Sequence, residues 1–198
     1  KGNATLVVST TYKDIAQSIK VSQAVTETAI GDFDNRGNPL VQNQKNYVFD
    51  IAGSPVLSTE LVINYSAYDA RGDAHTINTK TINHQTGVAV YTSETISTNR
   101  SFDSEHHAVN AEEWQYLVNP DGSRVSSSPD PISVTEKRYS GFESGVPALE
   151  VTATYSDKSK TLVIGVTEVR NSSIGADGFV GRTIVTKYSG RAASDTMD

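Results

Sequence analysis

Apolar and polar residues alternate along most of the chain, and this period of two predicts β-strands. In a strand, successive side chains point to opposite faces, so every second residue shares one environment. The first alternating stretch lies near the N-terminus, and one of its faces is formed by Ala4, Leu6, Val8, Thr10 and Tyr12. A second stretch with the same pattern covers residues 15–29.

Nine further strands are predicted on the same grounds. They lie within residues 47–51, 57–67, 75–82, 88–97, 114–118, 132–139, 149–155, 162–169 and 179–188. Clusters of Gly, Pro, Asn and Asp predict turns between them, at residues 31–39, 69–73 and 119–122 among others. Residues 108–113 are predicted as one helical turn, and no internal repeat of 20–50 residues is evident.

About eleven strands at this spacing predict an all-β chain. We expect an antiparallel β-sandwich or a jelly-roll-like barrel of about eleven strands, formed by a single domain over residues 1–198. The Ser- and Pro-rich residues 126–131 mark a possible subdivision. Composition favours the same class, because the chain has 21 Val but only 7 Leu, and β-branched side chains fit a pleated surface.

Charge and composition argue against several classes of function. The net charge is −6 and the basic residues form no run, so the concentrated positive surface that nucleic acids require is not predicted. No apolar stretch approaches the ~18 residues of a transmembrane helix, so membrane insertion is not expected. The chain has no cysteine, which excludes disulfides, thiolate metal ligands and thiol nucleophiles.

Catalytic patterns are not found in the sequence. The Gly-x-Ser-x-Gly elbow, the Walker loop and the dinucleotide fingerprint are all missing, so we expect no enzyme, no catalytic residue and no cofactor. His106 and His107 lie beside Asp103 and Glu105, and imidazole with carboxylate suits a transition metal. Adjacent residues of a strand point to opposite faces, however, so a solvated polar loop is favoured over a metal site.

Two further motifs allow both a functional and a structural interpretation. Residues 32–37 begin like a calcium loop, but Arg36 occupies the position of an oxygen ligand and Asn43 stands where a bidentate Glu is required, so an Asx-rich turn is favoured. Arg71-Gly72-Asp73 is an RGD tripeptide, which integrins recognise when it is exposed. A turn in which Gly72 supplies a positive φ is the favoured interpretation.

Two features of the sequence bear on glycans: N-glycosylation sequons and aromatic side chains. Four sequons begin at Asn3, Asn64, Asn99 and Asn171, a number close to chance for this composition. Aromatic side chains can bind sugars by stacking, and the candidates to check for exposure are Tyr12, Tyr68, Tyr91 and Trp114.

One short segment is similar to a known family. Residues 68–77 (YDARGDAHTI) resemble a hairpin of flagellar hook proteins, in which Tyr-Asp-x-x-Gly-x-x-His precedes an alternating strand. The resemblance covers ten of the 198 residues, and the long terminal helices of hook proteins are not predicted. No family is assigned on this basis.

Two hypotheses for function remain. The first is a structural subunit of a self-assembling extracellular filament, surface appendage or virion. Its strand edges would join other copies of the chain, with the face from Ala4 to Tyr12 as the inter-subunit strand. The second is a glycan-binding or adhesin module that contacts a glycan or a cell surface. An extracellular, cell-surface or virion location is expected for either.

The first residue bears on the location. The chain begins at Lys1 rather than Met, which we expect to reflect signal-peptide cleavage or maturation of a virion precursor. A sequence that was simply cut at this point is the alternative.

Overall fold

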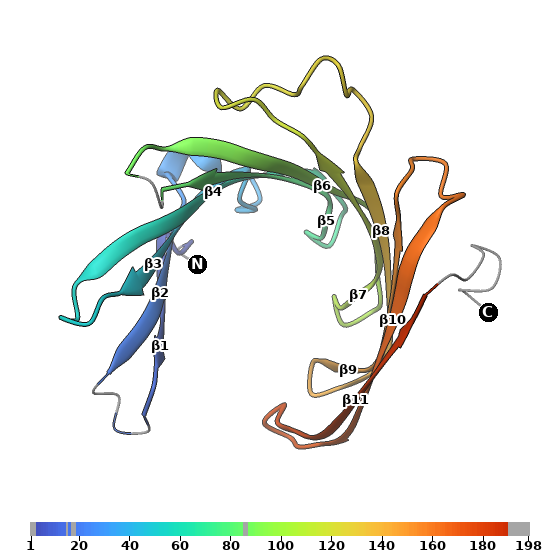
Figure 1. The fold of residues 1–198 in the computed structure, drawn as a ribbon. Coiled ribbons are helices and arrows are strands. Elements are labelled where there is room, and N and C mark those ends of the chain that lie inside the picture. The colour runs from blue at the N-terminus through green and yellow to red at the C-terminus, as the bar shows by residue number, and fades with distance from the viewer. Residues whose placement is uncertain (1–2, 15, 17–18, 85–86, 190–198) are drawn as a thin grey trace.

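A single antiparallel sheet of eleven strands makes up the computed structural model, which describes residues 3–14, 16, 19–84 and 87–189 (Figure 1). Each strand pairs with its neighbours in chain order, from β1 at one edge to β11 at the other. The strands are β1 (Leu6–Tyr12), β2 (Lys20–Glu27), β3 (Val41–Phe49), β4 (Pro55–Tyr68), β5 (Ala74–Asn83), β6 (Val90–Phe102), β7 (Ala108–Tyr116), β8 (Ser133–Glu143), β9 (Val146–Tyr155), β10 (Val163–Ile174) and β11 (Val180–Tyr188). One 3-10 turn, Ile30–Asp32, precedes β3.

The all-β class and the antiparallel pairing predicted from the sequence are confirmed, but the sandwich and the jelly-roll-like barrel are not. A sandwich needs two stacked sheets and a jelly roll needs long crossovers, whereas this chain forms one sheet in nearest-neighbour order that does not close. Alternation shows that each strand has two unlike faces; it does not show what covers them. The helical turn predicted at residues 108–113 is wrong, because this segment pairs with both neighbours as β7.

The predicted strands otherwise correspond to the observed ones, with shifted ends. Residues 126–131 lie in the connection between β7 and β8, and those two strands pair with each other in the common sheet. Lys1 and Ile15, which entered the sequence analysis, lie outside the described residues.

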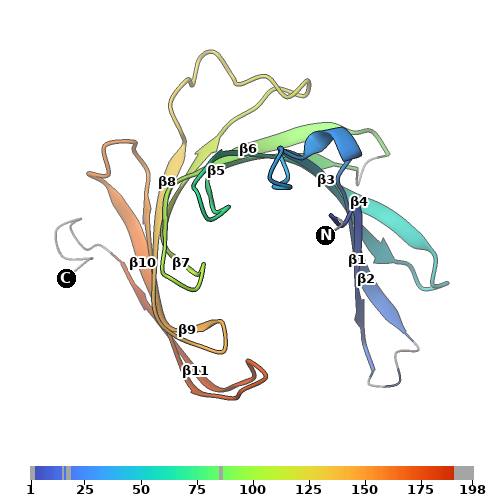
Figure 2. The same cartoon turned by 180° about the vertical axis from the view of Figure 1, so that it is seen from behind.

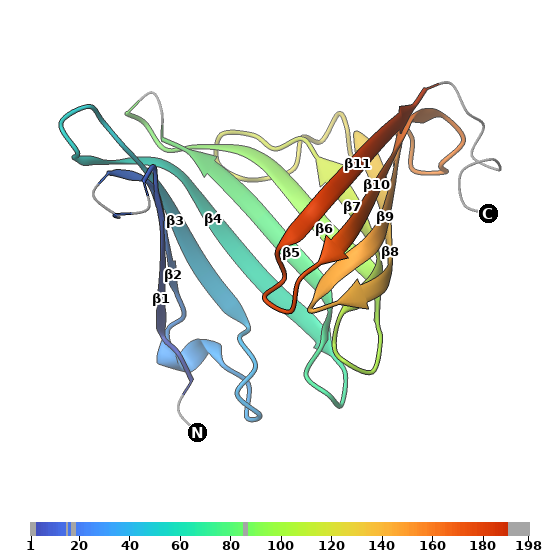
Figure 3. The same ribbon diagram turned by 90° about the horizontal axis from the view of Figure 1, so that it is seen from below.

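The sheet curves into an open trough. Figures 1 and 2 show its strands along an arc with a wide gap between β1 and β11, and Figure 3 looks into the trough through this gap. The turns after β2, β4 and β6 gather towards the middle of the arc in Figure 1. We call this the narrow end of the trough.

The two faces of the sheet differ in chemistry, and a loop identifies the outer one. Residues 117–132 lie outside the arc in Figures 1 and 2, and Arg124 of this loop donates to Glu94 of β6 at 2.6 Å. The side chain of Glu94 therefore belongs to the outer face. Residues paired directly across strands share a face, so Tyr116, which pairs with Glu94, lies there too.

Loops cover the outer face where the apolar side chains gather. Trp114, Val134 and Tyr155 are direct partners across β7, β8 and β9, and Val134 is fully buried. Ala153 and Val166 complete this core cluster. From the β9–β10 loop, Lys158 lies over the Trp114 ring at 5.8 Å and Lys160 bonds to Glu112 and Glu136. Long side chains from the loops thus cover part of the apolar outer face, as a second sheet would in a sandwich.

Val134→Ala tests whether this cluster carries the stability of the sheet. We expect the free energy of unfolding to fall by about 2 kcal/mol, because two fully buried methyl groups are lost and a cavity remains. The control is Val185→Ala on β11, where the side chain is 55% exposed and the change should stay within about 0.5 kcal/mol. Urea denaturation followed by tryptophan fluorescence measures both, and equal losses would contradict this assignment of the core.

Candidate functional site

The free edge at β1 is the most unusual surface of the sheet. Leu6, Val7 and Val8 are 56%, 53% and 51% exposed, so apolar side chains face solvent on both faces of one strand. No residue of β1 carries a charge. Edge strands are ordinarily protected against pairing by lysine, proline or inward-pointing charges, and β1 has none of these.

The backbone of β1 is equally open. Thr28 donates its N–H to the carbonyl of Thr5 at 2.9 Å. Thr5 and every second residue after it, including Val7 and Ser9, therefore point their backbone N–H and C=O groups towards β2. In an antiparallel pair the intervening residues point these groups away from the partner. Leu6, Val8 and Thr10 therefore present N–H and C=O groups to the free edge.

Leu6, Val8 and Thr10 are three of the five residues predicted from the sequence to form the inter-subunit strand. Ala4 precedes β1, and Tyr12 follows a register shift at its end.

The opposite edge, at β11, has a different character. Ile184 and Val185 are 43% and 55% exposed there, but Arg182 and Lys187 add two positive charges to the strand. Two β11 edges would repel each other, whereas β1 repels neither edge.

The same type of turn occurs three times at the narrow end of the trough. Asp34, Asp69 and Asp103 each begin a tight turn in which the aspartate carboxylate accepts the backbone N–H groups two and four residues later. The fourth residue of each turn has a positive φ, at Gly37, Gly72 and His106. The aspartates recur at intervals of 35 and 34 residues, each preceded by Phe or Tyr. The sequence analysis missed this repeat, although the recurring Phe/Tyr-Asp pair was its visible signal.

The three turns are linked to one another as a ladder. Arg36 of the first turn donates to the carbonyl of Asp69 at 2.8 Å, and Arg71 of the second donates to the carbonyl of Asp103 at 2.6 Å. His106 of the third turn contacts the carboxylate of Asp73 at 3.0 Å. We refer to these contacts as the turn ladder, which holds three successive hairpins together at one end.

The turn ladder accounts for the two loop motifs of the sequence analysis. In residues 32–37, backbone N–H groups and the Asn38 amide occupy the carboxylate of Asp34, as an Asx turn requires. These hydrogen bonds, led by that of the Asn38 backbone, lower the pKa of Asp34. In the RGD tripeptide, Arg71 forms an ion pair with Asp73 at 3.2 Å, and the Asp73 side chain is only 11% exposed. The two charges that an integrin would read are already paired.

His106 and His107 face different partners. His106 contacts Asp73 of the neighbouring turn, while His107 contacts Asp103 at 3.0 Å and stacks on Phe142 with ring centroids 4.4 Å apart. Among the described residues, no three His, Asp or Glu side chains are placed to hold a metal ion.

The aromatic candidates for sugar stacking are largely engaged. Trp114 is half-buried on the outer face, between the core cluster and Lys158, and its indole N–H donates to Glu112 at 3.1 Å. Tyr68 donates its hydroxyl to the carbonyl of Pro39, and burial raises its pKa to about 12. Tyr91 packs against Gly122 of the outer loop.

Of the four sequons, those at Asn3, Asn64 and Asn99 have exposed asparagines, whereas Asn171 is half-buried.

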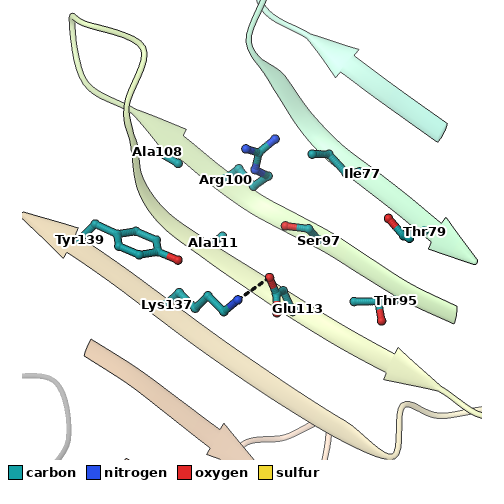
Figure 4. A pocket seen from close by; sticks show the side chains of 10 residues that line it. All are labelled: Ile77, Thr79, Thr95, Ser97, Arg100, Ala108, Ala111, Glu113, Lys137 and Tyr139. Atoms are coloured by element: carbon teal, nitrogen blue, oxygen red, sulfur yellow. Dashed lines mark hydrogen bonds and ion pairs between the residues drawn. The ribbon is translucent and has the colours of Figure 1, made fainter. Parts of the chain in front are cut away.

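A shallow cavity of about 400 Å³ opens on the inner face (Figure 4). It spans four neighbouring strands, β5 to β8, and is lined by Ile77, Thr79, Thr95, Ser97, Arg100, Ala108, Ala111, Glu113, Lys137 and Tyr139. Lys137 and Glu113 form an ion pair across its floor at 2.7 Å. Burial lowers the pKa of Arg100 and raises that of Tyr139. The sequence analysis did not find this site, because its residues are spread over 63 positions of four strands.

No protein-family model and no curated protein sequence matches the chain. In the described part of the chain there is no helix long and apolar enough to cross a membrane.

Asp69→Asn tests the turn ladder through pH. Backbone N–H groups of Asp73 and Arg71, with the Arg71 guanidinium, lower the pKa of Asp69 to about 2. The ordinary pKa of an aspartate is about 3.9, so the unfolded state takes up the proton first as the pH falls. The stabilisation by this carboxylate is therefore complete above pH ~4 and lost towards pH 2. We expect Asp69→Asn to be less stable than the wild type at pH 7, with the difference shrinking between pH 4 and pH 2.

Urea denaturation at a series of pH values measures this difference. Asp130→Asn is the control, since that side chain is 71% exposed and, among the described residues, its one ion pair is with the exposed Lys158 at 3.3 Å. A difference between wild type and Asp69→Asn that stays constant from pH 7 to pH 2 would show that the carboxylate charge does not hold the turn.

Proposed function

We propose that the chain is a non-enzymatic structural subunit that joins other copies of itself through strand edges, in an extracellular filament, a surface appendage or a virion. The observation that carries this proposal is the edge at β1: no described strand pairs with its free side, it carries no charge, and Leu6, Val7 and Val8 expose apolar side chains on both of its faces. Such an edge is a template for another strand, because backbone groups supply the hydrogen bonds and alternate side chains set the register.

The direction of the strands defines how copies can join. Neighbouring strands are antiparallel throughout, so β1 and β11, the first and the eleventh, run in the same direction. Copies that follow one another in the same orientation would pair β1 with the β11 of the next copy as a parallel ladder. Copies related by a two-fold axis would instead pair β1 with β1 as an antiparallel ladder.

We favour the head-to-tail arrangement of β1 on β11. It satisfies both free edges of every copy, whereas a two-fold β1 contact leaves both β11 edges of the dimer open. The two positive charges of β11 meet a neutral strand in this arrangement, so they do not oppose it. A heterologous contact of this kind repeats without limit unless it closes into a ring, which suits a filament or a shell.

Val8→Pro tests the role of the edge without breaking the fold. The Val8 N–H points away from β2, so proline removes a donor from the free edge but none from the pairing of β1 with β2. We expect the domain to stay folded and the concentration needed for assembly to rise about tenfold or more, as for one lost backbone hydrogen bond and an added steric conflict.

The matched control is Val7→Pro, whose N–H points towards β2 and which should therefore weaken the folding of β1. Sedimentation velocity and negative-stain microscopy report assembly, and circular dichroism reports folding. Unchanged assembly of Val8→Pro, or a monomeric wild type at all concentrations, would overturn the proposal.

The absence of cysteine allows a second test, of orientation. Val8→Cys and Ile184→Cys place one thiol each in β1 and β11 of two separate proteins. The head-to-tail arrangement predicts that oxidation of the mixture yields a disulfide-linked heterodimer, seen on a non-reducing gel. If Val8→Cys alone dimerises as efficiently as the mixture, the contact is two-fold between β1 edges and the head-to-tail arrangement is wrong.

A further inference from the structure

We propose that the inner face of the trough binds an acidic polysaccharide, with a sugar carboxylate on Arg100 and sugar hydroxyls on the surrounding Ser, Thr and Tyr side chains. This returns to the glycan-binding alternative of the sequence analysis, but places the site in the cavity of β5 to β8 rather than at Trp114. It does not depend on assembly.

Arg100 is the first element of the site. Its side chain is half-buried, one Nη donates to the carbonyl of Ala74 at 2.6 Å, and the guanidinium lies 4.9 Å from the centre of the Phe102 ring. Within the described residues it has no carboxylate partner, in contrast to Arg36, Arg71 and Arg124. A guanidinium carries five N–H donors in a rigid fork that matches a carboxylate. Arg100 therefore has both charge and donors left for a ligand.

Free hydroxyl groups surround this arginine. Thr79, Thr95, Ser97 and Tyr139 line the same cavity, and none of their hydroxyls has a hydrogen-bond partner in the part of the chain that the structure describes. Figure 4 shows Thr79 and Thr95 on one side of Ser97 and Tyr139 on the other, with the Lys137–Glu113 ion pair between Tyr139 and Thr95. Within the described residues, these hydroxyls without a partner lie beside one guanidinium that has no carboxylate partner. This arrangement is complementary to a ligand with many hydroxyls and one acid group per unit.

The balance of charge selects between polyanions. A nucleic acid or a heavily sulfated chain needs many cations in a row, whereas this cavity has two basic residues, of which Lys137 is already paired with Glu113. The chain as a whole has a net charge of −6. A polymer with one carboxylate per sugar and hydroxyls elsewhere is therefore favoured.

Isothermal titration calorimetry with a tetramer of galacturonic acid tests the site. The comparison ligands are the neutral galactose tetramer, a tetra-aspartate peptide and acetate. We expect the galacturonate to bind, and the neutral sugar, the peptide and acetate each to bind at least tenfold more weakly. Equal binding of the neutral sugar would overturn the role of the carboxylate, and equal binding of the peptide would overturn the saccharide. No detectable binding of galacturonate at millimolar concentration would overturn the whole site.

Variants assign the binding to the cavity. Arg100→Gln should weaken galacturonate binding about tenfold or more, the range for a charged hydrogen bond. Arg100→Lys should weaken it by a smaller factor, because the charge remains but the fork is lost. Arg170→Gln is the matched control: Arg170 is 60% exposed and paired with Glu168, away from the cavity, and should leave affinity unchanged.

Ser97→Ala keeps the test decisive if Arg100→Gln does not fold. It removes a hydroxyl without a protein partner, so it should weaken galacturonate binding severalfold at unchanged thermal stability. Wild-type affinity in both Ser97→Ala and Arg100→Lys would place the ligand elsewhere and overturn the proposal.

Discussion

A sheet satisfies the backbone groups of each strand only through the strand beside it, and this requirement shapes the whole molecule. Sandwiches and barrels meet it by closing the sheet or covering its edges. This chain runs through eleven strands in order and stops with the first and last strands apart. The outward N–H and C=O groups of Leu6, Val8 and Thr10 are the direct consequence, and the proposed assembly follows from them.

Because the open sheet is a single layer, both of its faces would be exposed to solvent without cover from the loops. On the outer face, the loops after β7 and β9 lie over the apolar strip of Trp114, Val134 and Tyr155. Arg124 fastens the first of these loops to β6 through the buried carboxylate of Glu94. Burial alone would raise the pKa of Glu94, but the hydrogen bonds from Arg124 and Asn78 outweigh it and lower the pKa. On the inner face, the cavity lining includes four hydroxyl side chains and the Lys137–Glu113 ion pair, which solvent can hydrate.

The two proposed roles are compatible in space. Assembly uses the edges of the sheet, whereas the polysaccharide site lies near its middle, on β5 to β8. If copies join β1 to β11 in one orientation, their sheets continue into one another and their inner faces lie on the same side. A long polymer could then contact several Arg100 side chains at once, which raises affinity without any new contact.

Repeated local chemistry links three hairpins at the narrow end of the trough. The aspartates at 34, 69 and 103 make the same turn three times, and Arg36 and Arg71 bind each turn to the next. Each of these contacts joins only two adjacent turns, yet together they hold three hairpins close at one end of the sheet. Asn38 lies 3.0 Å from the position that a Cβ would take at Gly72, so glycine is needed there both for its positive φ and for this close approach.

The sequence by itself determined the strands, their number and most of the turns, because alternation, β-branched side chains and Asp-x-x-Gly turns act over a few residues. It also suggested the face from Ala4 to Tyr12 as an inter-subunit strand, and the structure places Leu6–Tyr12 at an edge of the sheet. Whether the sheet would fold over into a sandwich, close, or stay open was decided only by the tertiary structure, since twist, register and loop cover act between strands. The same holds for the turn ladder, whose contacts join residues 32 or 33 positions apart, and for the cavity at Arg100, whose lining extends from Ile77 to Tyr139. Both form only once the register between the strands is set.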